Sequence, residues 1–354
     1  MKNPKKNILV APLNWGLGHA TRCIPIIQAL QDNGFNPIIA SDGEALRMLQ
    51  KEFPNVPTEV LPSYKIQYAK KGAFFKWKMI LNLPKMILAT IREKKATAKL
   101  IKKHQLSGII SDNRLGVFSK KIPSVFITHQ LNVLTGNTTA FTSLVHQKII
   151  KKFTECWIPD VETKPNLSGK LGHLDKPGFN LKYIGPLSRL HKKNLEIEYQ
   201  LMIILSGPEP QRTMLEEKLL DEIQRYSGKI LFVKGKIESE QIFGTKENVT
   251  FYNYMNTEQL ENAFNQSEMV LCRSGYTTVM DLAQLGKKAF FIPTPGQYEQ
   301  VYLAKKLKRE LLVPYATQDN FKIENLEEVA LYKGLKNLSC VITWNKLFSL
   351  FQSK

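Results

Sequence analysis

The chain has 354 residues, 43% of them hydrophobic and 23% charged, a balance typical of globular proteins with buried cores and not of disordered or fibrous chains. Its formal net charge of +19 favours a polyanionic partner: nucleic acid, an anionic membrane surface or a phosphorylated substrate. No apolar run approaches the roughly 20 residues that a membrane-spanning helix needs, and the N-terminal run is too short for a signal peptide. The cysteines form no Cys-x-x-Cys pair, so we expect a reduced, cytoplasmic chain without a zinc site. They are Cys23, Cys156, Cys272 and Cys340.

In the first half, short β-rich runs alternate with helical stretches. The expected strands are Asn7–Pro12, Pro37–Ser41, Gly108–Ser111, Ser124–Thr128 and Glu155–Ile158. The expected helices are Ala20–Asn33, Glu44–Glu52, Leu83–Lys103 and Thr139–Lys152. Strands separated by helices indicate a parallel sheet with crossover connections, and so a doubly wound α/β domain.

The pattern restarts after Tyr183–Glu196, a stretch with Gly-Pro and clustered charge that is typical of a linker. The second set of expected strands is Glu198–Ser206, Lys229–Val233, Val249–Tyr252, Met269–Cys272 and Ala289–Ile292, and the expected helices are Gln211–Tyr226, Thr257–Asn265 and Thr277–Leu285. We predict two similar α/β domains, residues 1–185 and 186–335, followed by an amphipathic helix within 336–354. A single large sheet with an insertion is the alternative.

The first strand leads into "NWGLGHATR", where Gly16-x-Gly18-x-x-Thr21 resembles a dinucleotide-binding turn. Thr21 stands where that turn needs Gly or Ala, but Asp42 follows where a ribose-binding acid would lie, so a nicotinamide enzyme stays open. His19 favours other chemistry. A helix N-terminus lowers the pKa of an imidazole, and a neutral imidazole suits a general base beside a phosphate-bearing donor. A capping or packing role for this histidine is the alternative.

The second half contains two further turns from strand to helix. Ser206-Gly207 in "MIILSGPEPQ" could hold a phosphate through backbone N–H groups and the hydroxyl, or it could be an ordinary turn. Ser274-Gly275 precedes a helix that begins near Thr277 and forms a second candidate anion cradle.

Polar side chains follow this second cradle. Asp281 lies about one turn into the helix and could accept hydrogen bonds from two ribose hydroxyls, or it could be a solvated helix acid. Beyond the next strand, a Pro-x-Pro-Gly turn leads into amides and an acid that could bind sugar hydroxyls, or that could simply face solvent. They are Gln297, Glu299 and Gln300.

Two polar residues of the first half follow strands. Asp112 ends the strand in "GIISDNRLG" and His129 follows the strand in "VFITHQL". Each could hold an acceptor or a substrate phosphate, while a polar turn and a hydrogen-bonded structural histidine are the alternatives.

Residues 65–103 hold twelve Lys or Arg against one acid, Glu93, with aromatic and aliphatic residues such as Trp77 between them. This composition is typical of an interfacial segment on anionic lipid, where each basic residue contributes about 1 kcal/mol. The alternative is a pair of core-packed helices separated at Pro84 with a solvated charged face. Nucleic acid is a less favoured partner, because no nucleic-acid module motif appears and the charge lies beside long aliphatic side chains.

Three segments together resemble the GT-B glycosyltransferases of family 28: "WGLGHATRCIPI", "LSGPEPQ" and, most specifically, "CRSGYTTVMDLAQLGKKAFFIPTPGQYEQVYLA". The resemblance implies two Rossmann-like domains facing a central cleft, with the C-terminal helix crossing back to the first domain. It also implies a nucleotide-sugar donor, a lipid-linked acceptor and a cytoplasmic chain docked peripherally on the membrane. Neither a metal nor a cofactor is implied, because helix dipoles and side chains stabilise the leaving diphosphate in such enzymes.

The resemblance assigns roles residue by residue. His19 is the implied catalytic residue, Asp281 stands where the family has a ribose-binding Glu, and the backbone near Tyr254 reads the base. The acceptor-side candidates are Asn14, Gly16, Asp112 and His129. The donor-binding candidates are Gly18, Ser206, Gly207, Tyr254, Met255, Arg273, Ser274, Gly275, Thr278, Asp281, Glu299 and Gln300. The chain departs from the family at Asn14-Trp15, which replaces a glycine pair, and at Pro208-Glu209-Pro210, which removes backbone donors and adds an acid.

The predicted reaction moves a hexose or N-acetylhexosamine from a nucleotide-sugar, with UDP as the favoured nucleotide, to an acceptor hydroxyl with inversion, and His19 or a neighbouring residue takes the proton. Three alternatives stay open: a UDP-sugar epimerase of GT-B fold, which would lack an acceptor; an NAD-dependent dehydrogenase, which would need Asp42 on a ribose; and a binding protein in which His19 is dispensable.

Overall fold

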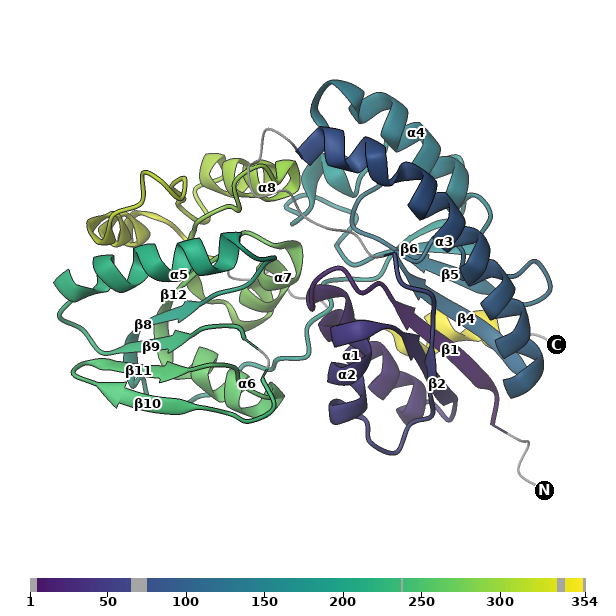
Figure 1. Ribbon diagram of the computed structural model, residues 1–354, viewed down its shortest axis with the longest axis horizontal. Helices are drawn as coiled ribbons and strands as arrows, with labels where there is room; N and C mark the ends of the chain where they lie inside the picture. The colour runs from purple at the N-terminus through teal and green to yellow at the C-terminus, as the bar shows by residue number, and fades with distance from the viewer. Residues whose placement is uncertain (1–4, 65–74, 237, 336–340, 353–354) are drawn as a thin grey trace. The chain divides into compact units, whose positions relative to one another are not determined.

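The computed structural model describes residues 5–64, 75–236, 238–335 and 341–352, apart from the side chains of 75–84. The chain divides into two compact units, and each is built on one β-sheet covered by helices (Figure 1). The described residues of the first unit are 5–64, 76–187 and 341–352, and those of the second include 188–236 and 238–335.

The sheet of the first unit has seven parallel strands in the order β3-β2-β1-β4-β5-β6-β7. The strands are β1 (Asn7–Pro12), β2 (Asn36–Ser41), β3 (Thr58–Val60), β4 (Leu106–Asp112), β5 (Ser124–Ile127), β6 (Glu155–Ile158) and β7 (Leu181–Tyr183). The helices are α1 (Gly18–Asp32), α2 (Gly43–Glu52), α3 (Phe75–His104), α4 (Thr139–Ile150) and, near the C-terminus, α9 (Trp344–Phe348).

The sheet of the second unit has the order β10-β11-β9-β8-β12-β13, and only the pair β10–β11 is antiparallel. The strands are β8 (Tyr199–Ile204), β9 (Ile230–Val233), β10 (Phe243–Lys246), β11 (Val249–Tyr252), β12 (Ser267–Cys272) and β13 (Lys288–Phe291). The main helices are α5 (Gln211–Glu222), α6 (Thr257–Asn265), α7 (Tyr276–Leu285) and α8 (Tyr298–Arg309). The predicted doubly wound α/β class is confirmed.

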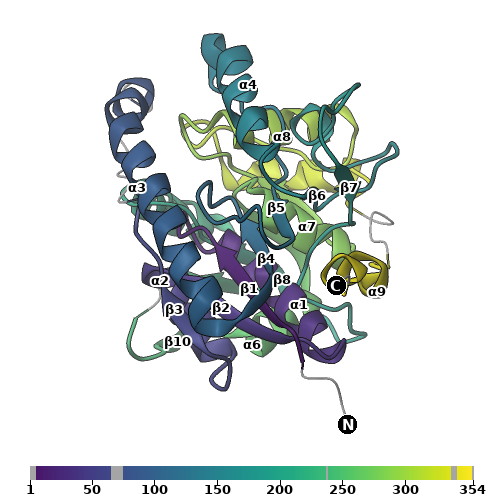
Figure 2. The same ribbon diagram turned by 90° about the vertical axis from the view of Figure 1, so that its right-hand side faces the viewer.

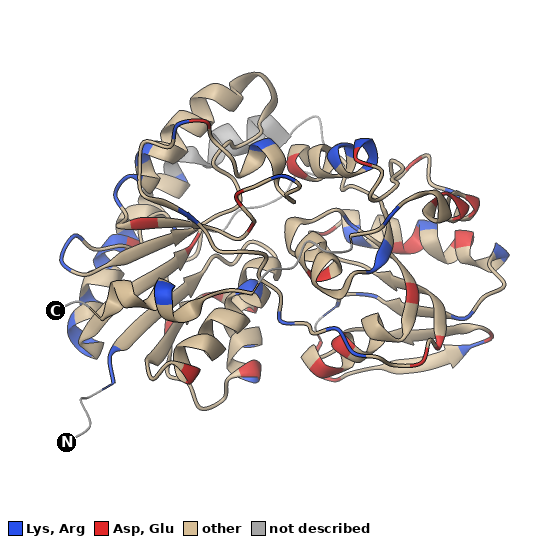
Figure 3. Cartoon of the chain, turned by 180° about the vertical axis from the view of Figure 1, so that it is seen from behind, with Lys and Arg blue, Asp and Glu red and all other residues tan. Residues whose placement is uncertain are grey.

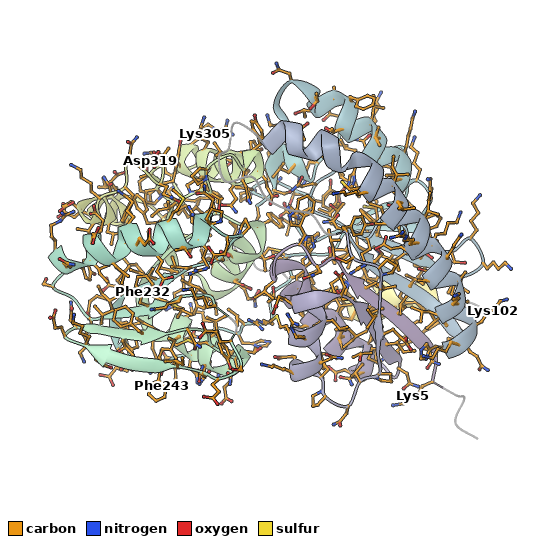
Figure 4. The ribbon with its side chains drawn as sticks, viewed as in Figure 1. Lys5, Lys102, Phe232, Phe243, Lys305 and Asp319 are labelled. Carbon is orange, nitrogen blue, oxygen red and sulfur yellow. The ribbon has the colours of Figure 1, made fainter. Side chains whose placement is uncertain are left out.

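The central strands are apolar along their whole length because helices cover both faces of a parallel sheet. Ile8, Leu9 and Val10 of β1 are all fully buried. In the second unit, Phe232 of β9 is fully buried, whereas Phe243 on the edge strand β10 is 68% exposed (Figure 4).

One face of the first sheet is covered by α3 and α4. Leu100 of α3 packs in a cluster with Leu9 and Ile109, and Ile150 of α4 packs in a cluster with Phe126. Ile109 and Ser111 are two residues apart on β4, so their side chains lie on the same face of the sheet. Ser111 pairs in register with Phe126 on β5, so Phe126 lies on that face as well. The two clusters therefore share a face, and α3 and α4 run along the same side of the sheet (Figure 2). Among the described residues, no helix is both long and apolar enough to cross a membrane.

The C-terminal segment packs against the same unit. Phe348 and Phe351 form ring contacts with Phe35 and Trp157. A side chain at Gly108 in β4 would lie 2.3 Å from the Phe351 ring, so the glycine makes room for this aromatic cluster. The packing of the C-terminal segment therefore depends on the space that Gly108 leaves in β4.

Some expected boundaries were wrong. Residues 75–104 form one helix through Pro84, not two helices separated there, because a proline removes a single backbone donor and need not end a long helix. The short strands β3, β7 and β10 were not predicted, since three or four residues carry too little alternation to be recognised. Residues 65–74 of the basic segment and 336–340 of the predicted C-terminal piece lie outside the described residues.

The packing of Phe351 on β4 generates a stability prediction. Gly108→Ala places a methyl group against the ring and against Ile8, so we expect the free energy of unfolding to fall by about 1–3 kcal/mol. The matched control is Gly244→Ala on β10, where nothing lies within 4 Å of the added carbon. Chemical denaturation of both variants measures the difference, and equal stabilities would contradict the packing.

Candidate functional site

Each sheet has one point at which the strand order reverses, and ligands of doubly wound folds bind outside the carboxyl ends of the strands at that point. In the first unit the reversal lies between β1 and β4, and in the second it lies between β8 and β12. The loop before His19 follows β1, and Asp112 ends β4. Ser206-Gly207 follows β8, and Arg273-Ser274-Gly275 follows β12. The predicted site residues thus gather at the reversal points of both sheets.

His19 and Arg22 lie three residues apart on α1, and such a spacing places two side chains on one helix face. The Arg22 guanidinium donates from Nε to Asp112 Oδ2 at 2.6 Å and from Nη2 to Asp112 Oδ1. It also lies 3.1 Å from Nδ1 of His129 through Nη1. Arg22 was not among the predicted site residues, although its spacing from His19 was a usable signal.

Burial separates the members of this cluster. Asp112 is fully buried and Arg22 is 2% exposed, whereas the side chain of His19 keeps 14% of its surface exposed. Asp112 and His129 were predicted as acceptor contacts. The structure instead places Asp112 behind His19, where its oxygens face Arg22 and His19, and it buries His129 beside Arg22.

Electrostatics within the cluster favour a neutral imidazole and an ionised carboxylate. Burial, assisted by the Arg22 charge, lowers the pKa of His19 below its ordinary value, although Asp112 opposes this shift. Burial alone would raise the pKa of Asp112, but the charges of Arg22 and His19 hold it well below its usual range. At neutral pH the arrangement is therefore a neutral histidine beside an arginine–carboxylate pair.

The Nδ1 atom of His19 lies 3.0 Å from Asp112 Oδ1 and 2.7 Å from Arg22 Nη2. Ionised Asp112 can only accept a hydrogen bond and Arg22 can only donate one. The tautomer of His19 therefore decides which of the two contacts is a hydrogen bond, and it also decides whether Nε2 carries a lone pair.

The loop between β1 and α1 holds the other predicted residues of this edge. Gly16 is exposed and has a φ of +78°, a conformation that favours glycine. Gly18 is the first residue of α1. Asn14 donates to Asp42 Oδ2 at 3.3 Å and accepts from the Ala45 N–H at 3.3 Å, so this side chain joins the loop to the start of α2.

Asp42 belongs to a second buried network. The Arg114 guanidinium pairs with Asp42 Oδ1 and, at 2.8 Å, with Glu93 Oε1. Tyr64 donates to the other Glu93 oxygen at 2.6 Å. Asp42 is 8% exposed and is bound to an arginine. Its side chain therefore joins β2 to the loop after β4 and is not placed to bind a ribose.

In the second unit, Ser206 and Gly207 are exposed, and Gly207 has a φ of +105°. The Glu209 carboxylate accepts from the Thr213 N–H at 3.2 Å and from Arg212 Nε at 2.6 Å. The acid of Pro208-Glu209-Pro210 therefore occupies the start of α5, where the sequence pattern would have placed a ligand phosphate.

The start of α7 is arranged differently. Gly275 is its N-cap residue and, having no side chain, makes no side-chain cap. A carbon added at Gly275 would meet nothing within 4 Å. This helix start has the open space and the backbone donors that an anion requires.

Arg273 and Ser274 support that turn from beneath. Arg273 is 1% exposed and donates to the carbonyls of Ile292 and Gln211. Ser274 is fully buried, and its hydroxyl donates to the Gln300 carbonyl at 2.9 Å. Both were predicted to contact the donor, but in this structure their side chains hold the loops that follow β12 and β13.

The remaining donor candidates surround these loops. Ser188 donates to Asp281 at 2.6 Å, and burial raises the pKa of Asp281 to about 6. The Gln300 side chain accepts from the Thr294 N–H and donates to Gln297. The Tyr254 carbonyl accepts from Gln241 at 2.7 Å. The partly exposed residues here are Tyr254, Met255, Gly275, Thr278, Asp281, Glu299 and Gln300.

Comparisons with known proteins identify a family domain and similar sequences. Residues 211–339 match the glycosyltransferase family 28 C-terminal domain. The chain is 24% identical over 356 residues to the UDP-N-acetylglucosamine–N-acetylmuramyl-(pentapeptide) pyrophosphoryl-undecaprenol N-acetylglucosamine transferase of Pasteurella multocida, and the match covers 94% of this chain and 93% of that one. The enzyme of the same name from Haemophilus influenzae is 25% identical, with 94% and 93% covered.

Solved structures share the fold. MurG of Acinetobacter baumannii superposes with a TM-score of 0.56 at 14% identity, covering 99% of both chains. The glycotransferase of kitacinnamycin gives a TM-score of 0.64 at 12% identity, covering 98% of this chain and 94% of that one.

The chain is a glycosyltransferase with the GT-B fold, and its residues 211–339 match the C-terminal domain of family 28. The predicted family, fold and enzyme class are confirmed. A glycosyltransferase is not an NAD-dependent dehydrogenase, so that alternative is excluded. The buried pair of Asp42 with Arg114 is consistent with this exclusion, because it leaves Asp42 unavailable to a ribose.

The buried pair of this glycosyltransferase generates a second prediction. Arg22→Leu leaves the Asp112 charge buried without a partner, so we expect the free energy of unfolding to fall by about 3–5 kcal/mol at neutral pH. The control is Arg47→Leu, whose pair with Glu44 is 65% and 50% exposed and contributes about 0–1 kcal/mol. Denaturant unfolding of the two variants checks this, and losses of the same size would contradict the importance of the buried pair.

Proposed function

We propose that this glycosyltransferase moves a hexose or N-acetylhexosamine from a UDP-sugar to the hydroxyl of a lipid-linked acceptor, with inversion and without a metal. The observation that carries the proposal is the cluster at the carboxyl edge of the first sheet. His19 lies there with Nδ1 beside both Asp112 and Arg22, and it keeps part of its ring exposed. The two transferases that match over most of the chain have UDP-N-acetylglucosamine and an undecaprenol-linked molecule in their names, which supports the choice of donor and acceptor.

The proposed chemistry begins at His19. Its Nδ1–H donates to Asp112, so Nε2 carries the lone pair. Nε2 takes the proton of the acceptor hydroxyl as the hydroxyl oxygen attacks the anomeric carbon. The new C–O bond forms while the bond from that carbon to the diphosphate oxygen breaks, and the nucleoside diphosphate leaves with the electron pair. Asp112 then stabilises the imidazolium that forms, and Arg22 keeps Asp112 ionised.

The second unit supplies the donor side of this proposal. The uncapped start of α7 offers backbone N–H groups to the leaving diphosphate, and helix dipoles favour negative charge at this end. Thr278 lies in the first turn, and Glu299 and Gln300 begin α8 nearby in the same unit. Asp281 would bind the ribose only after its bond with Ser188 is exchanged.

A lipid-linked acceptor requires that the enzyme reach a membrane surface. Large apolar side chains are exposed on the two helices that cover one face of the first sheet: Ile87 at 61%, Leu88 at 47% and Ile91 at 50% on α3, with Phe141 at 71% and Leu144 at 57% on α4. Exposed basic residues accompany them on α3, namely Lys85, Arg92, Lys94 and Lys95. Apolar anchors beside cationic charge fit an anionic lipid surface, and we propose that this face docks there from the cytoplasmic side.

The base assignment has a direct kinetic test. His19→Ala is expected to lower kcat by about 10²–10⁴-fold, the usual contribution of a positioned general base, with little change in the KM for the donor. The control is His104→Gln, at the opposite edge of the same sheet, where the imidazole pairs with Glu59. A His19→Ala enzyme with wild-type kcat would remove the assignment.

The pH dependence follows from the lowered pKa of His19. A base must be neutral to act, so activity is retained as the pH falls and is lost only as the pH passes through this pKa, below the ordinary value of 6.5. The acid limb of kcat/KM is thus expected below pH 6.5. Asp112→Asn removes the carboxylate that raises this pKa, so the limb should move to still lower pH while kcat falls. An acid limb above 6.5 would contradict the arrangement.

Membrane docking is tested by flotation with vesicles of anionic phospholipid. The double variant Ile91→Ser, Phe141→Ser is expected to bind at least about tenfold more weakly, because each large apolar side chain contributes about 1.5–3 kcal/mol when fully buried. Val60→Ser on β3 is the control, since Val60 is 76% exposed on a different element. Equal binding of the double variant and the wild type would exclude this face as the dock.

A further inference from the structure

A loop that the predicted site did not include touches the predicted phosphate loop of the second unit. Lys234-Gly235-Lys236 follows β9, next to β8 in the sheet. Gly235 has a φ of +68°, and a carbon added there would lie 2.1 Å from the Leu205 carbonyl oxygen and 3.8 Å from the Ser206 nitrogen. Only glycine fits this approach, so the two lysines are held on either side of a point in contact with the Leu205 carbonyl, next to Ser206.

Three cations converge on one carboxylate in this place. Arg212 Nη1 lies 2.7 Å from Glu216 Oε2, while the ammonium groups of Lys234 and Lys236 lie 3.3 and 3.5 Å from Glu216 oxygens. Opposite charges lie close together on this unit in Figure 3. Burial alone would raise the pKa of Glu216, but the three cations lower it, so the acid is ionised.

The charges of this cluster do not cancel. Arg212 is committed to two carboxylates, those of Glu209 and Glu216, and is buried. The lysines make longer contacts and remain 34% and 40% exposed. Arg212 and the two lysines carry three positive charges, and Glu209 and Glu216 carry two negative charges. One positive charge is therefore in excess, and the flexible ammonium groups can turn toward a ligand.

Thr294 lies on the other side of the phosphate loop. Within the described part of the chain, its hydroxyl is buried and has no hydrogen-bond partner. A carbon added at Gly207 would lie 3.7 Å from this hydroxyl oxygen. Since a buried polar atom without a partner is costly, this oxygen is suited to a bond that a ligand at Gly207 would complete.

We propose that Lys234 and Lys236, with the Thr294 hydroxyl opposite, form an anion subsite over Ser206-Gly207 that binds the diphosphate of the donor together with the start of α7. The lysines supply hydrogen-bond donors in place of the backbone N–H groups that Pro208 and Pro210 lack. The subsite does not use the start of α5, because the Glu209 carboxylate already accepts from the Thr213 N–H there. The inference rests on the proposed function for the identity of the ligand. Binding of inorganic pyrophosphate tests the subsite independently of the proposed function.

The test measures binding to the full-length protein by isothermal titration calorimetry with pyrophosphate, UDP and uridine. Lys234→Ala and Lys236→Ala are each expected to weaken pyrophosphate and UDP binding about tenfold, the typical value of one charge-assisted hydrogen bond, and together about a hundredfold. Uridine binding should not change. Thr294→Val should weaken pyrophosphate binding severalfold. Lys246→Ala on the exposed strand β10 is the control for net charge, and circular dichroism confirms that each variant is folded.

The outcomes separate the subsite from the proposed function. Pyrophosphate binding that is lost in the lysine variants and kept in Lys246→Ala supports the subsite, whether or not UDP is the nucleotide. Pyrophosphate and UDP affinities equal to wild type in the double lysine variant overturn the subsite and leave the transferase proposal standing. A wild-type protein that binds pyrophosphate but no nucleoside diphosphate contradicts the proposed donor and not the subsite. A wild-type protein that binds neither pyrophosphate nor UDP overturns both.

Discussion

A buried ion pair between Arg22 and Asp112 sets the electrostatic environment of His19 in the first unit. It joins α1 to the end of β4 across the point where the strand order reverses, and it presents a carboxylate oxygen 3.0 Å from His19 Nδ1. Moving two charges out of water costs about as much as their attraction returns, so such a pair is weak evidence for added stability. Its consequence is electrostatic. Arg22 keeps Asp112 ionised, while burial, assisted by the Arg22 charge, lowers the pKa of the neighbouring imidazole and keeps it neutral, which is the state that a general base requires.

For the second unit we propose the complementary role, the binding of negative charge at the start of α7. There the backbone of an uncapped helix faces open space, and the buried Arg273 supports it through carbonyl contacts. Burial lowers the pKa of Arg273 to about 10, which leaves it charged at neutral pH beneath the loop. In both units a buried arginine fixes the loops at the reversal point, and the groups with exposed surface are left for ligands.

Sequence patterns predicted most of the architecture and only part of the site. Continuous apolar runs such as Ile8–Val10 identify central parallel strands, because such strands are buried on both faces. His19 stood out from its glycine loop, and its partner Arg22 could have been found from the helical spacing. The burial of Asp112 and the inward orientation of Arg273 could not be predicted from the sequence, because desolvation depends on which distant elements pack around a side chain. Likewise, the contact of Gly235 with Leu205 joins loops that lie far apart in the sequence.

The most direct test of the central claim is the tautomer and pKa of His19, measured by ¹⁵N NMR of the imidazole nitrogens across a pH titration, with His19→Ala used for assignment. We predict a neutral ring at pH 7 with the proton on Nδ1, facing Asp112, and the lone pair on Nε2. Protonation should begin only below the ordinary pKa of 6.5. A ring that carries its single proton on Nε2, with Nδ1 accepting from Arg22, or an imidazolium that persists at pH 7, would contradict the role of His19 as the base.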